Sequence, residues 1–414
     1  MDSWIRGARI IDPQTQRDHV GDVLIRNFTI QAVEASLDFS GREILEIDGQ
    51  GCILGPGLVD LYSQTGDPGD EARETLENFQ KAAAQGGITR VGILPNTTPA
   101  IDNPAMVIRQ LAHNATGKPL MLPWGAITHG TQGNQLTDLM ELSATGVVGL
   151  SDGQPFKQGR VMQRLLEYMQ SSSLPLALWP SDNTQAGICR DGVDAIRLGL
   201  SPLSVTAETK PLTALIEEVA SSLRPVHLMR ISTARSVELI RMAKERGMPI
   251  TASVTWLHLL FSTADLDSYA PSLRLAPPLG TPEDREALIA GLEDGTLDAI
   301  AIDHCVYTYE EKAVPFELAP PGAVGLQLAL PVLWQHFVAT NRWTALQLWG
   351  YLSLNPAQCL NIEPASLQIG NAANLVLFDP TYEWLVTSET LGCDPINTPY
   401  HNQKICGHAK HIWI

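Results

Sequence analysis

The chain has 414 residues, of which 44% are hydrophobic and 18% are charged, and its formal net charge is −17. This length and apolar content are those of a globular protein with one large domain and a smaller one, and they exclude a disordered chain. Because the 28 lysines and arginines form no basic run, neither nucleic acid nor an anionic membrane surface is expected as a partner.

Both ends of the chain predict short strands. The N-terminus lacks a basic region followed by an apolar run, so we expect no signal peptide, and no apolar stretch approaches the roughly 20 residues of a membrane span. Alternating segments bounded by Gly, Asp, Pro or Asn occur at 4–11, 20–25, 30–33, 43–47, 369–379 and 410–414. We therefore expect a small β-sandwich domain formed by residues 1–52 and 365–414.

The region 53–364 repeats a strand followed by a helix. Eight apolar segments read as strands, at 57–63, 88–95, 119–128, 147–151, 174–179, 225–230, 248–254 and 297–303. Helical patterns that end at a glycine follow several of them, at 70–85, 232–246 and 281–294. Alternating strands and helices predict an α/β fold, a (β/α)8 TIM-like barrel with its site at the carboxyl ends of the strands. An open doubly wound sheet is the alternative.

The six cysteines are scattered along the chain and form no C-x-x-C pair. They are Cys52, Cys189, Cys305, Cys359, Cys393 and Cys406. This pattern favours reduced thiols in a cytoplasmic protein over a disulfide framework or a zinc site with thiolate ligands.

The stretch GPGLVDLYSQTGDPG at 55–69 resembles the first barrel strand of the metal-dependent amidohydrolases, and most closely that of dihydroorotase. In that family the strand reads Asp-x-His-x-His-x-Arg-x-Pro-Gly. The resemblance continues in GGITRVGILPNTTPAIDNP at 86–104, in ISTARSVELIRMAKERGMPITASVT at 231–255, in PPLGTPEDREALIAGLEDGTLDAIAIDH at 277–304 and in APPGAVGL at 319–326. It therefore covers nearly the whole chain.

The resemblance places other residues where the family has its four zinc-binding histidines. The two histidines of the first strand correspond to Tyr62 and Gln64, the one after the fifth strand to Trp179, and the one before the Ser-Thr of the sixth strand to Arg230. Asp303 matches the acid that serves the family as metal ligand and general base.

The remaining positions that the resemblance implies are also altered. Asp152 stands in a Ser-Asp-Gly loop that is one Asp shorter than the family's Ser-Asp-Asp-Gly. The substrate-binding arginine of the first strand corresponds to Gly66, and the amide and arginine of the family's Asn-Pro-Pro-Leu-Arg correspond to Ala276 and Gly280. Asn96 of Pro-Asn-Thr persists, and we expect it to satisfy backbone groups at a strand end.

These substitutions remove the chemistry of a zinc hydrolase. Catalytic zinc keeps at least three protein ligands, and a phenol, an amide, an indole and a guanidinium do not supply them. We therefore expect no metal and no other cofactor, and no dihydroorotase activity by the family mechanism. The sequence instead predicts that Arg230 bonds Asp303 or Asp152 as a counter-ion, with Tyr62 and Trp179 filling the vacated volume.

Other polar residues are expected to be structural. Successive residues of a strand point to opposite faces, so Asp303, His304 and Cys305 are not expected to form a catalytic triad. We expect His227 and His258 to be packing residues with satisfied hydrogen bonds.

The favoured interpretation is a non-catalytic dihydroorotase homologue. The resemblance to inactive family members implies a structural or regulatory subunit that assembles with the aspartate carbamoyltransferase catalytic chain in de novo pyrimidine biosynthesis, and it also implies a homodimer. Two alternatives stay open: a cyclic amidohydrolase with a rebuilt site, and a sensor that binds a pyrimidine precursor without hydrolysing it.

Overall fold

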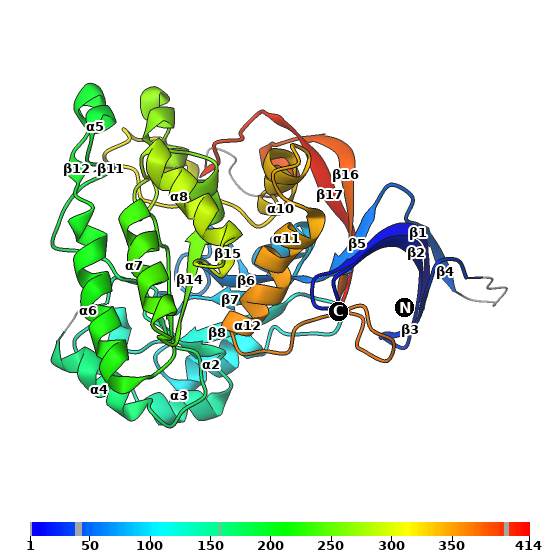
Figure 1. The fold of residues 1–414 in the computed structure, drawn as a ribbon, viewed down its shortest axis with the longest axis horizontal. Coiled ribbons are helices and arrows are strands. Elements are labelled where there is room, and N and C mark those ends of the chain that lie inside the picture. Colours follow the sequence, from blue (N-terminus) through cyan, green and yellow to red (C-terminus); the bar gives the residue numbers. More distant parts are fainter. Residues whose placement is uncertain (1, 38–43, 157–158, 393–396) are drawn as a thin grey trace.

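The computed structural model describes residues 2–37, 44–156, 159–392 and 397–414. Within these residues a barrel of parallel strands is surrounded by helices, and a separate sheet is built from both ends of the chain (Figure 1). The predicted fold class is therefore confirmed. Cys393 and the first residue of the predicted strand 43–47 lie outside the described residues.

All eight predicted barrel strands are present close to their predicted positions. They are β6 (Leu58–Ser63), β7 (Ile88–Ile93), β8 (Leu120–Gly125), β9 (Gly149–Leu150), β10 (Ala177–Leu178), β13 (Val226–Leu228), β14 (Ile250–Thr255) and β15 (Ala299–Ala301). They pair in two parallel runs, β6-β7-β8-β9 and β10-β13-β14-β15. A bridge between Leu150 and Leu176 joins the two runs, and the N–H of Asp303 donates to the carbonyl of Tyr62 at 3.1 Å, which closes the ring.

A buried acid, Asp60 of β6, holds the closing seam of the barrel. One carboxylate oxygen accepts the backbone N–H of Ile302 at 2.8 Å, and the other accepts the Ser63 hydroxyl. Burial raises the pKa of Asp60 to about 7. Because Ile302 follows the last strand, this side chain ties the first barrel strand to the eighth.

Helices cover the outside of the barrel (Figure 1). They are α1 (Leu76–Gln85), α2 (Pro104–Leu111), α3 (Leu139–Thr145), α4 (Arg160–Tyr168), α5 (Val193–Leu198), α6 (Thr206–Ser222), α7 (Ala234–Glu245), α8 (Pro282–Glu293), α9 (Tyr309–Lys312), α10 (Ala329–Leu333), α11 (Ala345–Trp349), α12 (Asn355–Cys359) and α13 (Ser388–Leu391). Helix α1 begins at Leu76 rather than at residue 70, because the Thr75 side chain accepts the N–H of Asn78 and caps the helix there. No helix of the described residues has both the length and the apolar content to cross a bilayer.

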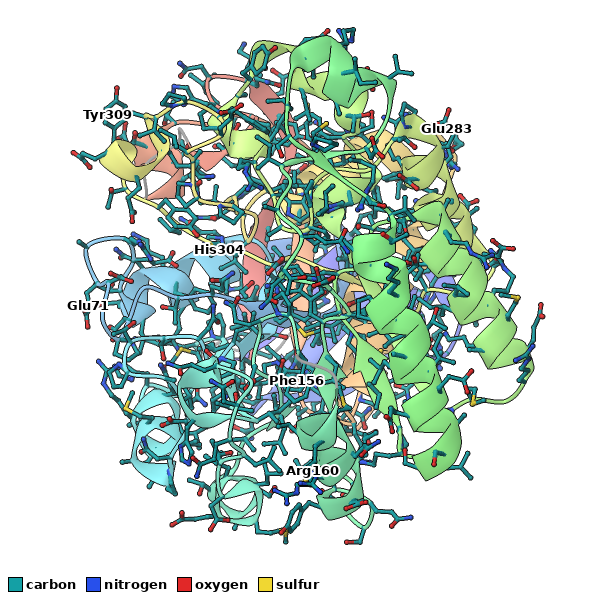
Figure 2. All side chains as sticks on the ribbon, turned by 90° about the vertical axis from the view of Figure 1, so that its left-hand side faces the viewer. Glu71, Phe156, Arg160, Glu283, His304 and Tyr309 are labelled. Carbon is teal, nitrogen blue, oxygen red and sulfur yellow. The ribbon has the colours of Figure 1, made fainter. Side chains whose placement is uncertain are left out.

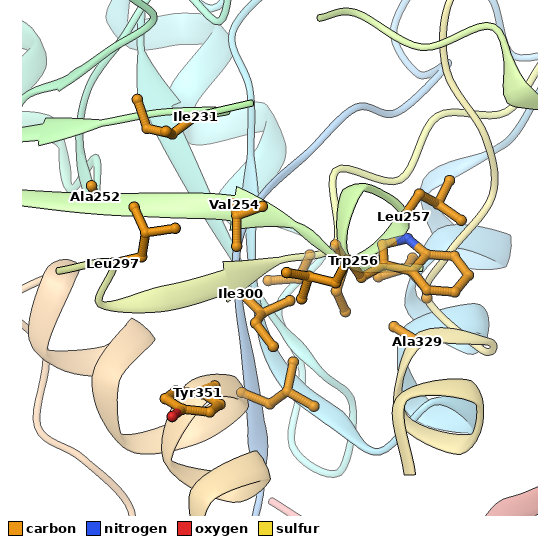
Figure 3. Close-up of a cluster of buried hydrophobic side chains, with 14 of the residues drawn as sticks. Ile231, Ala252, Val254, Trp256, Leu257, Leu297, Ile300, Ala329 and Tyr351 are labelled. Atoms are coloured by element: carbon orange, nitrogen blue, oxygen red, sulfur yellow. The ribbon is translucent and has the colours of Figure 1, made fainter. Parts of the chain in front are cut away.

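The apolar residues separate into a layer outside the barrel strands and a smaller cluster inside. Outside, Val254 and Ile300 pack with helical residues such as Tyr351 (Figure 3). Inside, the small side chains Ala299 and Ala301 belong to a cluster that also holds bulky aromatic rings. Small residues on one side of the interior leave room for large polar groups near the carboxyl ends of the strands.

The terminal sheet has seven strands. They are β1 (Ser3–Asp12), β2 (Arg17–Arg26), β3 (Thr29–Glu34), β4 (Leu45–Asp48), β5 (Ile53–Pro56), β16 (Leu375–Leu385) and β17 (Lys404–Trp413). Their order is β17-β16-β5-β1-β2-β3, with β4 beside β1, and they enclose a core of their own that includes Ile10 and Leu375. Strand β5, just beyond the predicted limit of the small domain, belongs to this sheet. A short pair, β11 (Cys189–Arg190) and β12 (Pro202–Leu203), flanks α5 and was not predicted.

Candidate functional site

A cavity of about 600 Å³ lies at the carboxyl ends of the barrel strands. Its lining combines carboxamide and imidazole groups with aromatic rings, from Gln64, Gln132, Asn134, Gln154, Asn183, His258, Trp179, Trp256 and Tyr307. Arg230 and Asp303 lie at the same cavity. This is the end of the barrel at which the sequence predicted a site.

Arg230 and Asp303 form a two-point ion pair. Arg230 Nε donates to Asp303 Oδ2 and Nη2 donates to Oδ1, both at 2.7 Å. The Arg230 side chain is 3% exposed and that of Asp303 15%. The predicted pairing of Arg230 with an acid is therefore present, and Asp303 is the acid.

The rest of the Arg230 guanidinium is also held by the protein. Nη1 donates to the carbonyl of Gly153 at 2.9 Å, and the rings of Trp179 and Tyr62 lie 4.6 and 5.4 Å from Cζ. Arg230 and Asp303 both have a positive φ, of 54° and 52°, which is uncommon outside glycine. This backbone conformation at the ends of β13 and β15 accompanies the turn of both side chains toward each other.

Tyr62 begins a chain of hydrogen bonds below the ion pair. Its hydroxyl accepts the backbone N–H of Arg230 at 3.1 Å and bonds the Ser253 hydroxyl at 2.9 Å. Ser253 in turn bonds His227 Nε2 at 2.9 Å, and His227 Nδ1 bonds Thr251 Oγ1 at 2.9 Å. Burial lowers the pKa of His227 to about 3, so this imidazole is neutral. The phenol at position 62 is thus a structural part of the barrel interior.

Asp152 does not join the ion pair. Its carboxylate accepts the backbone N–H of Thr128 at 2.9 Å and the Thr128 hydroxyl at 2.6 Å. Asp152 is buried, and burial raises its pKa to about 6. Asp152, the alternative partner predicted for Arg230, is therefore bonded to Thr128 in the loop that follows β8.

The positions that correspond to substrate residues separate into two groups. Ala276 lines the cavity together with Gln64, which stands at a former zinc-ligand position and whose Oε1 accepts a hydrogen bond from Asn96 Nδ2 at 3.1 Å. Asn96 was expected to bond backbone groups, but its side-chain amide donates to the Gln64 side chain. Gly66 and Gly280 do not line the cavity. A β-carbon at Gly66 would lie 2.3 Å from the Asp70 carbonyl oxygen. A side chain therefore does not fit at position 66 in this backbone.

The buried histidines have structural partners, as predicted. His258 Nδ1 bonds Thr255 Oγ1 at 2.6 Å and Nε2 bonds the Pro277 carbonyl at 3.1 Å, and burial lowers the pKa of His258 to about 4. His304 Nδ1 accepts the N–H of Gly325 at 3.0 Å, and Nε2 lies 3.3 Å from Glu74. His304 lies inside the ring of helices in Figure 2 and does not line the cavity that Asp303 lines. Residues 303–305 lie beyond the end of β15, and of these three residues Asp303 alone lines the cavity.

The donor set does not fit a zinc ion. Arg230 is a fixed cation that occupies both carboxylate oxygens of Asp303, and the Trp179 indole is a donor only. Among the residues that the structure describes, no three His, Cys, Asp or Glu side chains gather closely enough to hold a metal ion. The arrangement can bind a ligand through amides and aromatic rings, but it offers no group that would polarise a carbonyl as zinc does.

Sequence reasoning missed several residues of the site. Trp256 lines the cavity from the start of a 3-10 helix directly after β14, Tyr307 lines it from the loop after β15, and no motif marked either residue. Asp60 carried a visible signal, because an acid within the apolar run Leu-Val-Asp-Leu is unusual for a buried strand. An acid in such a place is expected to make buried hydrogen bonds, and Asp60 makes them where the first barrel strand meets the last.

Comparison with known proteins gives a consistent family. The Dihydro-orotase-like family model matches residues 51–184, and the Amidohydrolase family model matches residues 212–405. The L-hydantoinase (dihydropyrimidinase) from Arthrobacter aurescens has a similar fold, with a TM-score of 0.84 at 20% identity, covering 99% of this chain and 94% of its own. Dihydropyrimidinase from Brevibacillus agri gives a TM-score of 0.81 at 19% identity, covering 100% and 93%.

Two curated relatives are more similar in sequence. A probable dihydroorotase-like protein from Synechocystis sp. is 40% identical in an alignment of 434 positions that covers 97% of this chain and 97% of the relative. The dihydroorotase of Caldanaerobacter subterraneus subsp. tengcongensis is 37% identical, covering 95% of this chain and 91% of the relative. The chain therefore belongs to the dihydroorotase-like amidohydrolase family.

Proposed function

We propose that this protein is a non-catalytic dihydroorotase homologue that acts as a structural or regulatory subunit. The observation that supports this most directly is the buried ion pair of Arg230 and Asp303, which lies where the family resemblance implies a metal ligand and a general base. The guanidinium cannot lose its proton near neutral pH, and a fixed positive charge there opposes a zinc ion. We propose accordingly that the protein uses no metal cofactor.

The proposed partner is the aspartate carbamoyltransferase catalytic chain of de novo pyrimidine biosynthesis. The support is the resemblance to inactive dihydroorotase-like chains that assemble with that enzyme. We propose a cytoplasmic location as well, in line with the five described cysteines, which are all free thiols. Co-purification of the tagged chain from its source, with identification of the proteins that accompany it, tests both the partner and the complex.

A cyclic amide hydrolase is the second candidate, and the relatives named dihydroorotase favour it. In that case the cavity of about 600 Å³ would hold a ring amide as substrate. Assays of dihydroorotate hydrolysis and of the reverse cyclisation, with and without added zinc, separate the two candidates. We expect no turnover above background and no zinc that stays with the purified protein. Turnover that a chelator abolishes, or zinc near one per chain, would favour the hydrolase.

The same cavity also permits a sensor that binds a pyrimidine precursor without hydrolysis. Its lining offers amide groups and aromatic rings but no free arginine, because Arg230 is paired. A ligand that binds only the folded state raises the melting temperature. A concentration-dependent rise with dihydroorotate or carbamoyl aspartate, without turnover, would support this role.

A further inference from the structure

A second cavity, of about 640 Å³, lies at the opposite end of the barrel from the first. It is bordered by the residues that begin β10, β13 and β14 and by the end of α12, and it includes Leu176, Val226, Ile250 and Cys359. The amino ends of barrel strands usually contribute to stability rather than to catalysis. A polar feature in this place therefore needs an explanation of its own.

Among the described residues that border this cavity, Arg224 is the one with a permanently charged side chain. It is 5% exposed, its Nη2 donates to the carbonyl of Leu174, and its buried Nε has no hydrogen-bond acceptor. No carboxylate of the described residues forms an ion pair with Arg224, whereas the buried Arg230 has Asp303. Burial lowers the pKa of Arg224, and no acid offsets this.

The groups around Arg224 leave its charge uncompensated. His227 borders the same cavity and is neutral, because burial lowers its pKa to about 3. Asp298, whose charge acts on the cavity residue Cys359, is already bonded to Lys244 at 2.7 Å. A buried guanidinium with an unused donor is costly unless an anion lies beside it. A chain whose net charge is −17 repels polyanions, whereas a single arginine can pair with a small anion.

The other residues that line the cavity indicate which kind of molecule fits beside Arg224. Three proline rings, of Pro175, Pro225 and Pro249, line the cavity together with several aliphatic side chains. The amides of Gln358 and Asn361 also border the cavity. We propose that this cavity binds a small organic anion, with a carboxylate or phosphate group on the Arg224 guanidinium and an apolar body on the prolines. The planar donor fork of arginine suits either head group.

Calorimetric titration of the full-length protein tests the proposal, with benzoate and phenyl phosphate as probes at fixed ionic strength. We expect saturable binding of at least one probe, and the tighter of the two identifies the head group. Arg224→Met is expected to weaken binding at least tenfold. Arg17→Met, at an exposed position of β2 in the terminal sheet, is expected to leave binding unchanged. Absence of binding by both probes, or equal binding to both variants, would overturn the proposal.

A second measurement keeps the test decisive if Arg224→Met does not fold. Crystals of the unmodified protein soaked with 4-bromobenzoate and with 4-bromophenyl phosphate would show bromine by anomalous scattering. The proposal expects bromine near the proline rings, with the head group in hydrogen-bonding distance of Arg224. Bromine found solely in the cavity of Arg230 and Asp303, or nowhere, would refute it. Because neither experiment involves dihydroorotate or the partner enzyme, failure here is distinct from failure of the proposed function.

Discussion

The indole of Trp179 lies over the guanidinium of Arg230, with Cζ 4.6 Å from the ring centroid. Asp303 bonds the edge of the same guanidinium through two oxygens. The protein therefore contacts both the face and the edge of the Arg230 guanidinium. The positive charge of Arg230 compensates the negative charge of Asp303. The stability of this end of the barrel should depend on the arginine.

Replacing Arg230 by Met should leave the Asp303 carboxylate without a partner. We expect Arg230→Met to lower the free energy of unfolding by about 3 to 5 kcal/mol in urea titrations. Adding Asp303→Asn should recover much of the loss, because asparagine tolerates the positive φ of this position and carries no charge. Arg241→Met is the matched control, since Arg241 pairs with Asp294 at the surface and should cost no more than about 1 kcal/mol. An unchanged unfolding midpoint for Arg230→Met would contradict the role of the pair.

Asp60 should give the stability a defined dependence on pH. The unfolded chain releases this proton near a pKa of 3.8, whereas the folded protein holds it to about 7. Between these values the folded state binds more protons, so raising the pH favours unfolding. The free energy of unfolding of the wild type minus that of Asp60→Asn should therefore fall as the pH rises from about 4 to about 7.

The difference between the two proteins is the informative quantity, because other buried groups titrate in the same range. His227 and His258 have lowered pKa values of about 3 and about 4, so they make stability rise with pH up to the ordinary histidine pKa. Both histidines are present in the wild type and in Asp60→Asn, and their effects cancel in the difference. A difference that stays constant across this range would contradict the burial of an uncharged Asp60.

Restoring histidine at positions 62, 64, 179 and 230 together should restore zinc binding more readily than turnover. The change removes the guanidinium from Asp303, which then becomes available as a ligand. Turnover should stay absent because positions 66 and 280 still lack arginines. Elemental analysis and a dihydroorotase assay measure the two properties. The triple variant that keeps Arg230 is the control, and equal zinc content in both variants would show that Arg230 does not exclude the metal.

We expect the isolated protein to be a homodimer that joins a larger complex, as the family resemblance implies. Sedimentation velocity should give the mass of two 45.0 kDa chains, and addition of aspartate carbamoyltransferase should produce a faster species. A monodisperse monomer that does not change on addition of that enzyme would contradict both parts.

The strand positions could be predicted from the sequence because apolar runs bounded by glycine and proline reflect local constraints. The pairing of Arg230 with an acid could also be predicted, since the resemblance placed both residues at one end of the barrel. The choice between Asp303 and Asp152 could not, because it depends on Thr128, which bonds Asp152 from a separate loop. The cavity residues Trp256 and Tyr307 lie beyond the ends of β14 and β15, where no local sequence pattern predicts the path of the chain.

The terminal sheet combines strands from both ends of the chain, so it cannot form completely until β16 and β17 have been synthesised. Strand β5 pairs with β16, and Trp413 near the C-terminus donates a hydrogen bond to Ser3 at 3.3 Å. During synthesis on the ribosome, the first strands therefore present an unpaired edge until almost the whole chain has emerged. Unpaired edges invite pairing with other chains. Without β16 the edge of β5 would stay unpaired, and loss of β17 would move the edge of the sheet from β17 to β16.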